Sequence, residues 1–406
     1  MYKKAILATS VTAILFSGIA QAGWKIDDNH NTVQQKLNIN GYLAPTAIHT
    51  SDNNFWGSTD DKISGNYMEV GIQGRYDFNP NLSFVTSGIY KGVGESKNAP
   101  DIDLAYLEYA YLNQFDHSQS IRIGKIDIPY GLHNTQRDNP FERINTFLAQ
   151  SLYQESFRDS GFSQTGVELN SETNYGWGNS NFSLGITRSN ENNQEINNMH
   201  EGISNVADFD SDYSGFIQLK NTNPSEKLVS AISYSFIQYD VKTKNSSFVS
   251  SGKASNEKAM YSLQYSATRN LTLTGEIEYN QWDFSDLNSP TINNDYGLGY
   301  NVKMDYKINN HWNTFISHGA TYNDFGDKDG SDYASTTTFG TPAHQRYTKD
   351  VTVGLGYKPA SNWLFRFEYS NFEGTSILPK QFKNSDPTNK YWDMVSLQAV
   401  YKFSVF

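Results

Sequence analysis

Long stretches of this chain alternate strictly between apolar and polar residues, which leaves few folds open to it. In residues 362–373, for example, Phe365 and Phe367 alternate with Arg366 and Glu368. Successive side chains of a β-strand point to opposite faces, so each such segment has one apolar and one polar face. Many of the segments reach ten or more residues, whereas soluble strands usually have ~5–6. A tilted strand needs ~9–11 residues to cross a bilayer, so the pattern predicts membrane-spanning strands.

The composition excludes several other classes of protein. The 406 residues include no cysteine, so the chain cannot be a disulfide-stapled module. Beyond the N-terminus it has no apolar run of the ~20 residues that a transmembrane helix needs. With 43 acidic against 32 basic residues, the chain is not expected to bind nucleic acid. Aromatic residues reach 14% although only 37% of the chain is hydrophobic, so the rings are dispersed among polar residues.

Sixteen segments show the alternation, and together they predict an all-β fold: a transmembrane antiparallel β-barrel. The predicted strands are 34–45, 65–78, 81–92, 101–112, 119–127, 160–173, 180–188, 212–222, 227–242, 256–267, 270–283, 293–307, 311–322, 346–358, 362–373 and 391–406. Strands 3, 6, 7 and 8 of this series are weakly patterned, so fourteen or eighteen strands stay open. A large soluble β protein is the alternative fold.

The connections between these strands alternate in length. Tight turns such as Asn79-Pro80-Asn81 follow the even-numbered strands, and longer polar segments follow the odd-numbered strands. Short periplasmic turns and long external loops are typical of outer-membrane barrels. A barrel of sixteen strands is wide enough to leave an aqueous channel.

The N-terminus has the pattern of an export signal. Lys3 and Lys4 precede an apolar run, and Ala20-Gln21-Ala22 fits a cleavage site. We therefore expect residues 1–22 to be a signal peptide and 23–406 to form a single barrel domain. Removal of the two lysines would change the net charge from −11 to −13, which argues weakly for cations as solutes. The C-terminal segment, which ends in Phe406, resembles the last strand of Gram-negative outer-membrane proteins. That resemblance implies recognition of Phe406 by the barrel-assembly machinery.

A run of about forty residues resembles a segment of Gram-negative porins, including the phosphate-selective type. It begins at Ser120-Ile121-Arg122-Ile123-Gly124-Lys125, continues through Pro129-Tyr130-Gly131, and contains Arg137-Asp138 and Arg158-Asp159. The resemblance implies a homotrimeric, passive, water-filled channel whose third loop, at about 128–159, folds into the lumen and narrows it. The constriction residues that it implies are Arg122, Lys125, Arg137, Asp138, Glu142, Arg143, Arg158 and Asp159.

Two interpretations of the charged residues in the third loop stay open. Arginines and carboxylates that face each other across a narrow lumen would create a field that orients polar solutes and selects ions by charge. Alternatively, the same residues would form internal ion pairs that fix the loop to the barrel wall.

Other chemistry has little support in the sequence. Asp327, Asp329 and Asp332 lie around Gly330 and form a weak calcium candidate, without the bidentate Glu that an EF-hand requires. The sequence predicts no further metal site, no cofactor site and no catalytic motif. His311 and His318 are the histidines on which a barrel hydrolase would depend.

The sequence therefore predicts a porin of the Gram-negative outer membrane, exported through the periplasm. It would pass small hydrophilic solutes and ions without a cofactor, in contact with membrane lipid and lipopolysaccharide. A loop-closed barrel that acts as a surface receptor or adhesin is the alternative, and a barrel hydrolase is a third.

Overall fold

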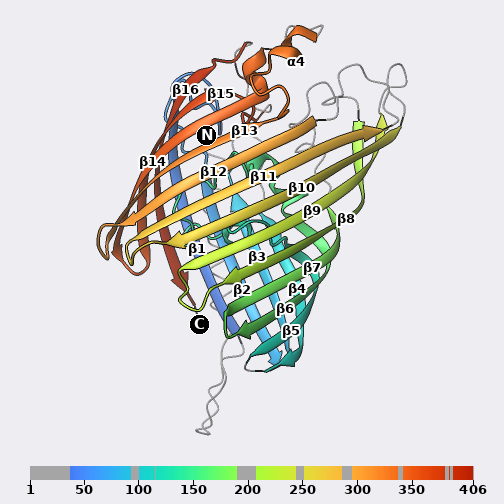
Figure 1. The fold of residues 1–406 in the computed structure, drawn as a ribbon. Coiled ribbons are helices and arrows are strands. Elements are labelled where there is room, and N and C mark those ends of the chain that lie inside the picture. Colours follow the sequence, from blue (N-terminus) through green and yellow to red (C-terminus); the bar gives the residue numbers. More distant parts are fainter. Residues whose placement is uncertain are drawn as a thin grey trace. The chain divides into compact units, whose positions relative to one another are not determined.

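The computed structural model is a closed antiparallel barrel in which each strand pairs with its neighbours in sequence and the last strand pairs with the first (Figure 1). The structure describes residues 37–405 apart from 93–99, 115, 190–206, 244–250, 286–294, 337–341, 380–383, 385 and 386. The predictions for residues 1–22 and for Phe406 lie outside the described residues.

The described residues form sixteen strands, which confirms the predicted count and fold class. The strands are β1 Leu37–Thr50, β2 Met68–Asn79, β3 Leu82–Lys91, β4 Asp101–Asn113, β5 His117–Asp127, β6 Ser163–Tyr175, β7 Gly178–Ser189, β8 Ala207–Thr222, β9 Leu228–Thr243, β10 Gly252–Ser266, β11 Leu271–Ser285, β12 Asp295–Lys307, β13 Trp312–Tyr322, β14 Tyr347–Ala360, β15 Trp363–Gly374 and β16 Tyr391–Ser404. Each overlaps one predicted segment, including the four weakly patterned ones.

The two largest errors in the predicted strand boundaries, five residues each, are the start of β8 and the end of β1. Strand β1 was expected to end at Pro45 but continues to Thr50. Proline has no backbone N–H and weakens a strand prediction. The ladder from β1 to β16 has no pair at Ala44 or Pro45, yet it resumes at Thr46 in the same register. The strand therefore continues past the missing donor.

Connection lengths alternate as predicted. Short turns join β2 to β3, β4 to β5 and each later even-numbered strand to the next, and we call this the short-turn end. The connections at the opposite, long-loop end include residues 51–67, 128–162, 323–346 and 375–390. These contain the helical turns η1 (Asn134–Gln136), η2 (Glu155–Phe157), α2 (Arg158–Gly161), α4 (Ser331–Thr336) and η3 (Ala343–Arg346). No helix in the described ranges is long and apolar enough to span a bilayer.

The strands expose their apolar faces and bury their polar ones. On β15, the side chains of Phe365 and Phe367 are exposed, whereas Arg366 and Glu368 are each 3% exposed. A soluble protein would reverse this arrangement. The polar residues line the inside of the barrel, and the outer surface suits hydrocarbon.

Aromatic side chains gather on the outer surface at the short-turn end. Tyr76 packs on Phe78, Tyr175 stacks on Trp177 at 4.9 Å between ring centroids, and Trp312 stacks on Tyr357 at 4.4 Å. Rings with an apolar body and a polar edge prefer the boundary between lipid and water. These pairs therefore form part of an aromatic girdle at this end of the barrel.

Gly124 of β5 is a position where the barrel needs glycine. Its φ is +138°, and a Cβ there would lie 2.1 Å from the carbonyl oxygen of Ala105 on β4. We expect Gly124→Ala to destabilise the barrel by more than about 1–2 kcal/mol, because the backbone strain and the clash add. Gly74→Ala is the matched control, since its Cβ would meet nothing closer than 3.9 Å. Urea unfolding followed by the heat-modifiable gel mobility of the barrel measures both, and equal stability of the two variants would contradict the prediction.

Candidate constriction site

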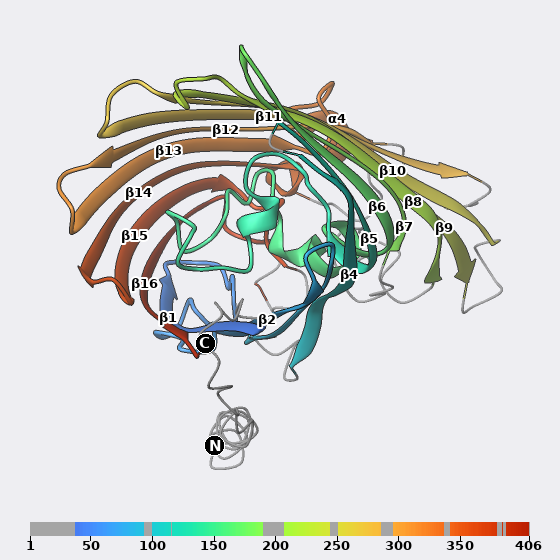
Figure 2. The ribbon, with the colours of Figure 1, turned by 90° about the horizontal axis from the view of Figure 1, so that it is seen from below.

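The long connection between β5 and β6 folds into the barrel (Figure 2). It spans 128–162, and we call it loop 3. Gly131 has φ +59°, and a Cβ on it would lie 2.0 Å from the hydroxyl of Tyr153. The first half of loop 3 therefore lies against Tyr153, which precedes the turns η2 and α2 in the second half. In the view of Figure 2, loop 3 lies within the ring of strands.

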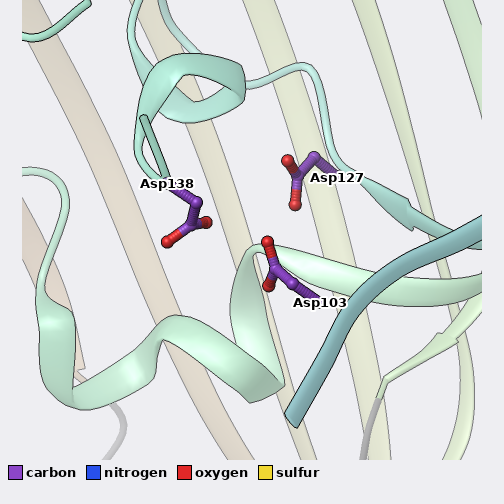
Figure 3. Close-up of side chains that lie close together, drawn as sticks. All are labelled: Asp103, Asp127 and Asp138. Atoms are coloured by element: carbon purple, nitrogen blue, oxygen red, sulfur yellow. The ribbon is translucent and has the colours of Figure 1, made fainter. Parts of the chain in front are cut away.

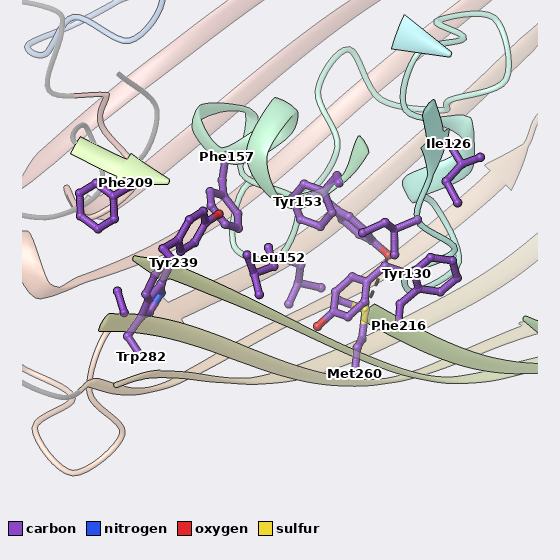
Figure 4. Packing of buried hydrophobic residues seen from close by; sticks show 14 of the residues in the cluster. Ile126, Tyr130, Leu152, Tyr153, Phe157, Phe209, Phe216, Tyr239, Met260 and Trp282 are labelled. Atoms are coloured by element: carbon purple, nitrogen blue, oxygen red, sulfur yellow. Dashed lines mark hydrogen bonds between the residues drawn. The ribbon is translucent and has the colours of Figure 1, made fainter. Parts of the chain in front are cut away.

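An apolar cluster fixes one side of loop 3 to strands β8 to β11. Leu152, Tyr153 and Phe157 of the loop pack against the wall residues Met260 and Trp282 (Figure 4). The rings of Phe157 and Trp282 meet edge to face, with centroids 6.0 Å apart. Burial of this many large side chains against a rigid wall holds the loop in one position.

Two glutamates of β11 hold the same side by hydrogen bonds. The hydroxyl of Tyr130 donates to Glu278 at 2.8 Å, and the hydroxyl of Tyr153 donates to Glu276 at 2.8 Å. The backbone N–H of Leu132 also donates to Glu276, at 3.0 Å. A buried carboxylate is stable only with such partners. Both glutamates are therefore engaged in positioning loop 3.

Ion pairs fix the opposite side of loop 3 to strands β2 to β4. Arg143 lies 2.5 Å from Glu69 of β2, and Arg158 lies 2.6 Å from Asp103 of β4. In the reverse sense, Lys91 of β3 lies 2.9 Å from Glu155 of the loop. The paired side chains are 6% exposed or less. Removal of one partner from a buried ion pair of this kind strongly destabilises a fold, because the other charge is left buried and unpaired.

Arg366 of β15 holds the backbone of loop 3. Its guanidinium donates to the carbonyl oxygens of Pro140, Arg143 and Ile144, and to the side chain of Gln398. A planar guanidinium has five N–H donors and suits such a multiple contact. Loop 3 is therefore attached to three separate parts of the barrel wall.

Electrostatics supports the anchoring role of the loop carboxylates. Burial alone would raise the pKa of Glu155, but the charges of Lys91, Arg137 and Arg158 outweigh burial and lower this pKa to about 2. The pKa of Asp138 is also below its ordinary value, because Arg158 and Lys91 outweigh burial there. Both groups are therefore held as carboxylates by the cations around them.

The structure separates the predicted constriction residues into groups. Arg137, Arg143 and Arg158 are buried, at 1%, 4% and 5% exposure, so their geometry favours the anchoring interpretation. Asp138 pairs with Arg158 at 2.8 Å. Glu142 accepts a hydrogen bond from Asn139 and lines the open cavity described below. The side chain of Asp159 lies outside the described part of the chain.

The two candidates on β5 lie on opposite faces. Arg122 faces the lumen and pairs with Glu108 at 2.6 Å and Glu168 at 3.2 Å, on the two neighbouring strands. Lys125 follows three residues later on an unbroken ladder, so its side chain projects to the outer face. Its amine donates to the carbonyl oxygen of Ile102. Arg122 fits a lining role, and Lys125 does not lie with the other candidates.

A cavity of about 580 Å³ remains between loop 3 and strands β10 to β15. Most of its lining residues are polar or charged. The charged members are Glu142, Arg143, Arg269, Glu276, Lys303, Asp305, Lys307, Lys358 and Arg366. Sequence reasoning missed most of the cationic wall residues as site residues, although the inward phase of each strand could have indicated them.

Three carboxylates converge near the base of loop 3, those of Asp103, Asp127 and Asp138 (Figure 3). One oxygen of each lies within 4.8 Å of the others. The guanidinium of Arg158 already contacts Asp103 and Asp138, at 2.6 Å and 2.8 Å. Arg158 therefore neutralises two of the three carboxylates, those of Asp103 and Asp138.

The weak calcium candidate has a different local role. Asp327 accepts hydrogen bonds from the backbone N–H groups of Asp332 and Tyr333, and Asp329 accepts from Ser331. These bonds satisfy free N–H groups in the first turn of α4. The carboxylates of Asp327, Asp329 and Asp332 are not among the converging groups of the described residues. Calcium binding there stays a prediction.

Solved outer-membrane proteins share this fold. The outer membrane channel DcaP of Acinetobacter baumannii matches with a TM-score of 0.58 and 11% identity, over 90% of this chain and 97% of that chain. An anion-selective porin from Comamonas acidovorans matches at 0.57 and 10%, over 90% and 99%. OmpT of Vibrio cholerae in its trimer form matches at 0.54 and 12%, over 90% and 99%. No protein-family model and no curated protein matches this chain.

These likenesses define the class of the fold. The chain has the sixteen-stranded barrel of Gram-negative outer-membrane porins. This confirms the predicted fold.

Removal of Arg143 tests the ionic anchor. We expect Arg143→Ala to lower the free energy of unfolding by about 3 kcal/mol, the lower end for a broken buried pair, because Lys91 stays 3.2 Å from Glu69. Arg75→Ala is the control, since its pair with Asp77 is exposed and contributes about 1 kcal/mol or less. Chemical unfolding in lipid vesicles measures both. Similar losses in the two variants would show that the anchor contributes no more than a surface pair.

The carboxylate of Glu155 predicts a pH dependence. Its folded pKa lies below the ordinary value of 4.5, so its stabilisation is complete above about pH 4.5 and is lost as the pH falls toward 2. We expect Glu155→Gln to be less stable than the wild type at pH 7 and to lose less stability between pH 4.5 and 2. Glu172→Gln serves as the control, because Glu172 is an exposed glutamate. A Glu155→Gln profile parallel to that of the wild type would refute the assignment.

Proposed function

We propose that this protein is an outer-membrane porin, a water-filled channel for passive diffusion of small hydrophilic solutes and ions. The observation that carries the proposal is a polar cavity of about 580 Å³ inside a closed barrel whose outer surface is apolar. A lipid-facing exterior around a polar interior fits a route for water-soluble molecules across a membrane. The similarity in fold to the outer membrane channel DcaP supports it.

In the proposed mechanism, a solute passes between loop 3 and the wall formed by β10 to β15. The anchored loop sets the width of the passage, so size is the first selection. The charged side chains along the cavity select among the solutes that fit. Diffusion down a gradient needs no cofactor and no chemical step.

The remaining parts of the proposal rest on the sequence. Residues 1–22 would direct export through the periplasm, and the barrel-assembly machinery would read Phe406. The outer surface would contact membrane lipid and lipopolysaccharide. A homotrimer is proposed from the resemblance in loop 3, and the trimer form of Vibrio cholerae OmpT supports it.

A second candidate function, a receptor or adhesin closed by its own loops, has one observation in its favour. Phe55 and Trp56 of the first long connection pack with Phe147 of loop 3 and Trp392 of β16. The rings of Phe55 and Trp392 are 5.8 Å apart. This cluster joins elements at the long-loop end and would narrow the entrance there.

A barrel hydrolase has less support. His318 contacts the hydroxyl of Tyr300 at 3.1 Å and the carbonyl oxygen of Asp350 at 2.7 Å. Ser317 is its neighbour on β13, so the two side chains project to opposite faces of the sheet. His311 contacts the carbonyl oxygen of Lys358. These contacts bring no described serine or threonine hydroxyl to either histidine.

Single cysteines distinguish an open channel from a closed barrel, because the chain has no cysteine of its own. Thr272 lines the cavity, and Leu273 beside it is exposed on the outer surface. We expect a charged thiol reagent to reduce the bilayer conductance of Thr272→Cys and to leave that of Leu273→Cys unchanged. Folded protein that inserts but conducts no current would favour the receptor. Equal effects at both positions would place the solute route elsewhere.

A further inference from the structure

The cavity carries more positive than negative side chains although the chain as a whole is acidic. Six cations line it, Arg143, Arg269, Lys303, Lys307, Lys358 and Arg366, against the three acids Glu142, Glu276 and Asp305. Part of this charge is neutralised locally, since Arg143 pairs with Glu69 and Lys303 lies 3.6 Å from Asp305. The cationic side chains without a carboxylate partner therefore determine the charge of the ions that the cavity attracts.

Three lysines occupy equivalent places at the short-turn end. Lys307 ends β12, Lys358 lies near the end of β14, and Lys402 lies near the end of β16. Each donates its backbone N–H to a carbonyl oxygen near the preceding short turn, those of Asn270, His311 and Asn362. They form an arc along one side of the barrel mouth, which we call the lysine arc.

The lysine arc faces the cavity. Lys307 and Lys358 line the cavity directly. Lys402 lies over the ring of Phe141, a loop 3 residue that also lines it, with its amine 4.2 Å from the ring centroid. The amine of Lys358 lies 5.2 Å from the same centroid. Two ammonium groups are therefore held beside one ring at the edge of the passage, an arrangement that the ring stabilises by cation–π attraction.

The positive charge of the arc is not compensated. Within the described residues, Lys307, Lys358 and Lys402 form no ion pair with a carboxylate. The charged groups that act most on Lys358 are all cations, namely Arg366, Lys402 and Lys307. An anion that enters the cavity would reduce the repulsion between these cations, whereas a cation would add to it.

We propose that the lysine arc attracts small oxyanions and makes the channel selective for carboxylates and phosphates over cations. This inference rests on the proposed function, because it concerns the same passage. The three lysines are exposed, so they would act as weak, exchangeable charges. Such charges raise the local concentration of anions without trapping them.

The first experiment measures reversal potentials across a planar bilayer in a gradient of potassium chloride. We expect the wild type to favour chloride over potassium. In the variant with Lys307→Gln, Lys358→Gln and Lys402→Gln, the anion-to-cation permeability ratio should fall about three- to tenfold, with the larger value at low salt. In gradients of potassium phosphate and potassium succinate, the anion-to-cation permeability ratio should again be higher in the wild type than in the triple variant.

A second triple variant controls for total charge. Lys62→Gln, Lys253→Gln and Lys390→Gln also removes three lysines, none of which lines the cavity. Its permeability ratio should equal that of the wild type. An unchanged ratio in the arc variant, an equal change in both variants, or a wild-type channel that favours potassium would overturn the inference.

A measurement that needs no conductance separates this inference from the proposed function. In folded protein, phosphate or succinate should slow acylation of Lys307, Lys358 and Lys402 relative to Lys62, as measured by peptide mass spectrometry. Protection of the arc in a barrel that conducts no current would keep the oxyanion site and refute the channel. Absence of protection in a conducting barrel would refute the site alone.

Discussion

The pairing of β1 with β16 is the constraint on which the rest of the structure depends. Hydrocarbon offers no partner to a free N–H or C=O group, so a sheet that crosses a bilayer has to close on itself. The ladder between β1 and β16 completes this closure, and it runs from the pair Asn40–Ser404 to the pair Thr50–Met394. Once the ring is closed, every strand has a lumen face and an outer face. The alternation of the sequence then follows as a consequence of where each face points.

Closure of the barrel also leaves an interior space that loop 3 partly fills. A ring of sixteen strands encloses more space than the inward side chains of the wall fill. Loop 3 fills part of this space, and it stays there because its apolar residues pack on β8 to β11 while its charged residues pair with β2 to β4. The two kinds of contact lie on opposite sides of the loop. The open cavity is what remains between the loop and the β10 to β15 wall.

The strands could be predicted because alternation is a local property of the sequence. The partners of loop 3 could not, since they depend on which strands face each other after closure. Arg143 pairs with a residue 74 positions away, and Arg158 with one 55 positions away. The sequence located these arginines and left two roles open for them. It did not indicate Lys91, Glu69 or Arg366 as anchors, because an inward charged residue looks the same whether it meets water or a loop.

The proposed solute preference could not be predicted from the sequence either, because it depends on which charged side chains lie beside the cavity. The expected net charge of −13 after removal of residues 1–22 argued weakly for cations, whereas the charged residues that line the cavity are mainly basic. Exposed charges farther apart than a Debye length, about 10 Å in 0.1 M salt, scarcely affect each other. An ion inside the passage therefore responds to the side chains beside it and not to acids elsewhere on the chain. Lys307, Lys358 and Lys402 are far apart in sequence, and only the turns of a closed barrel bring them to one rim. Their combined charge is a property of the fold that no count of residues contains.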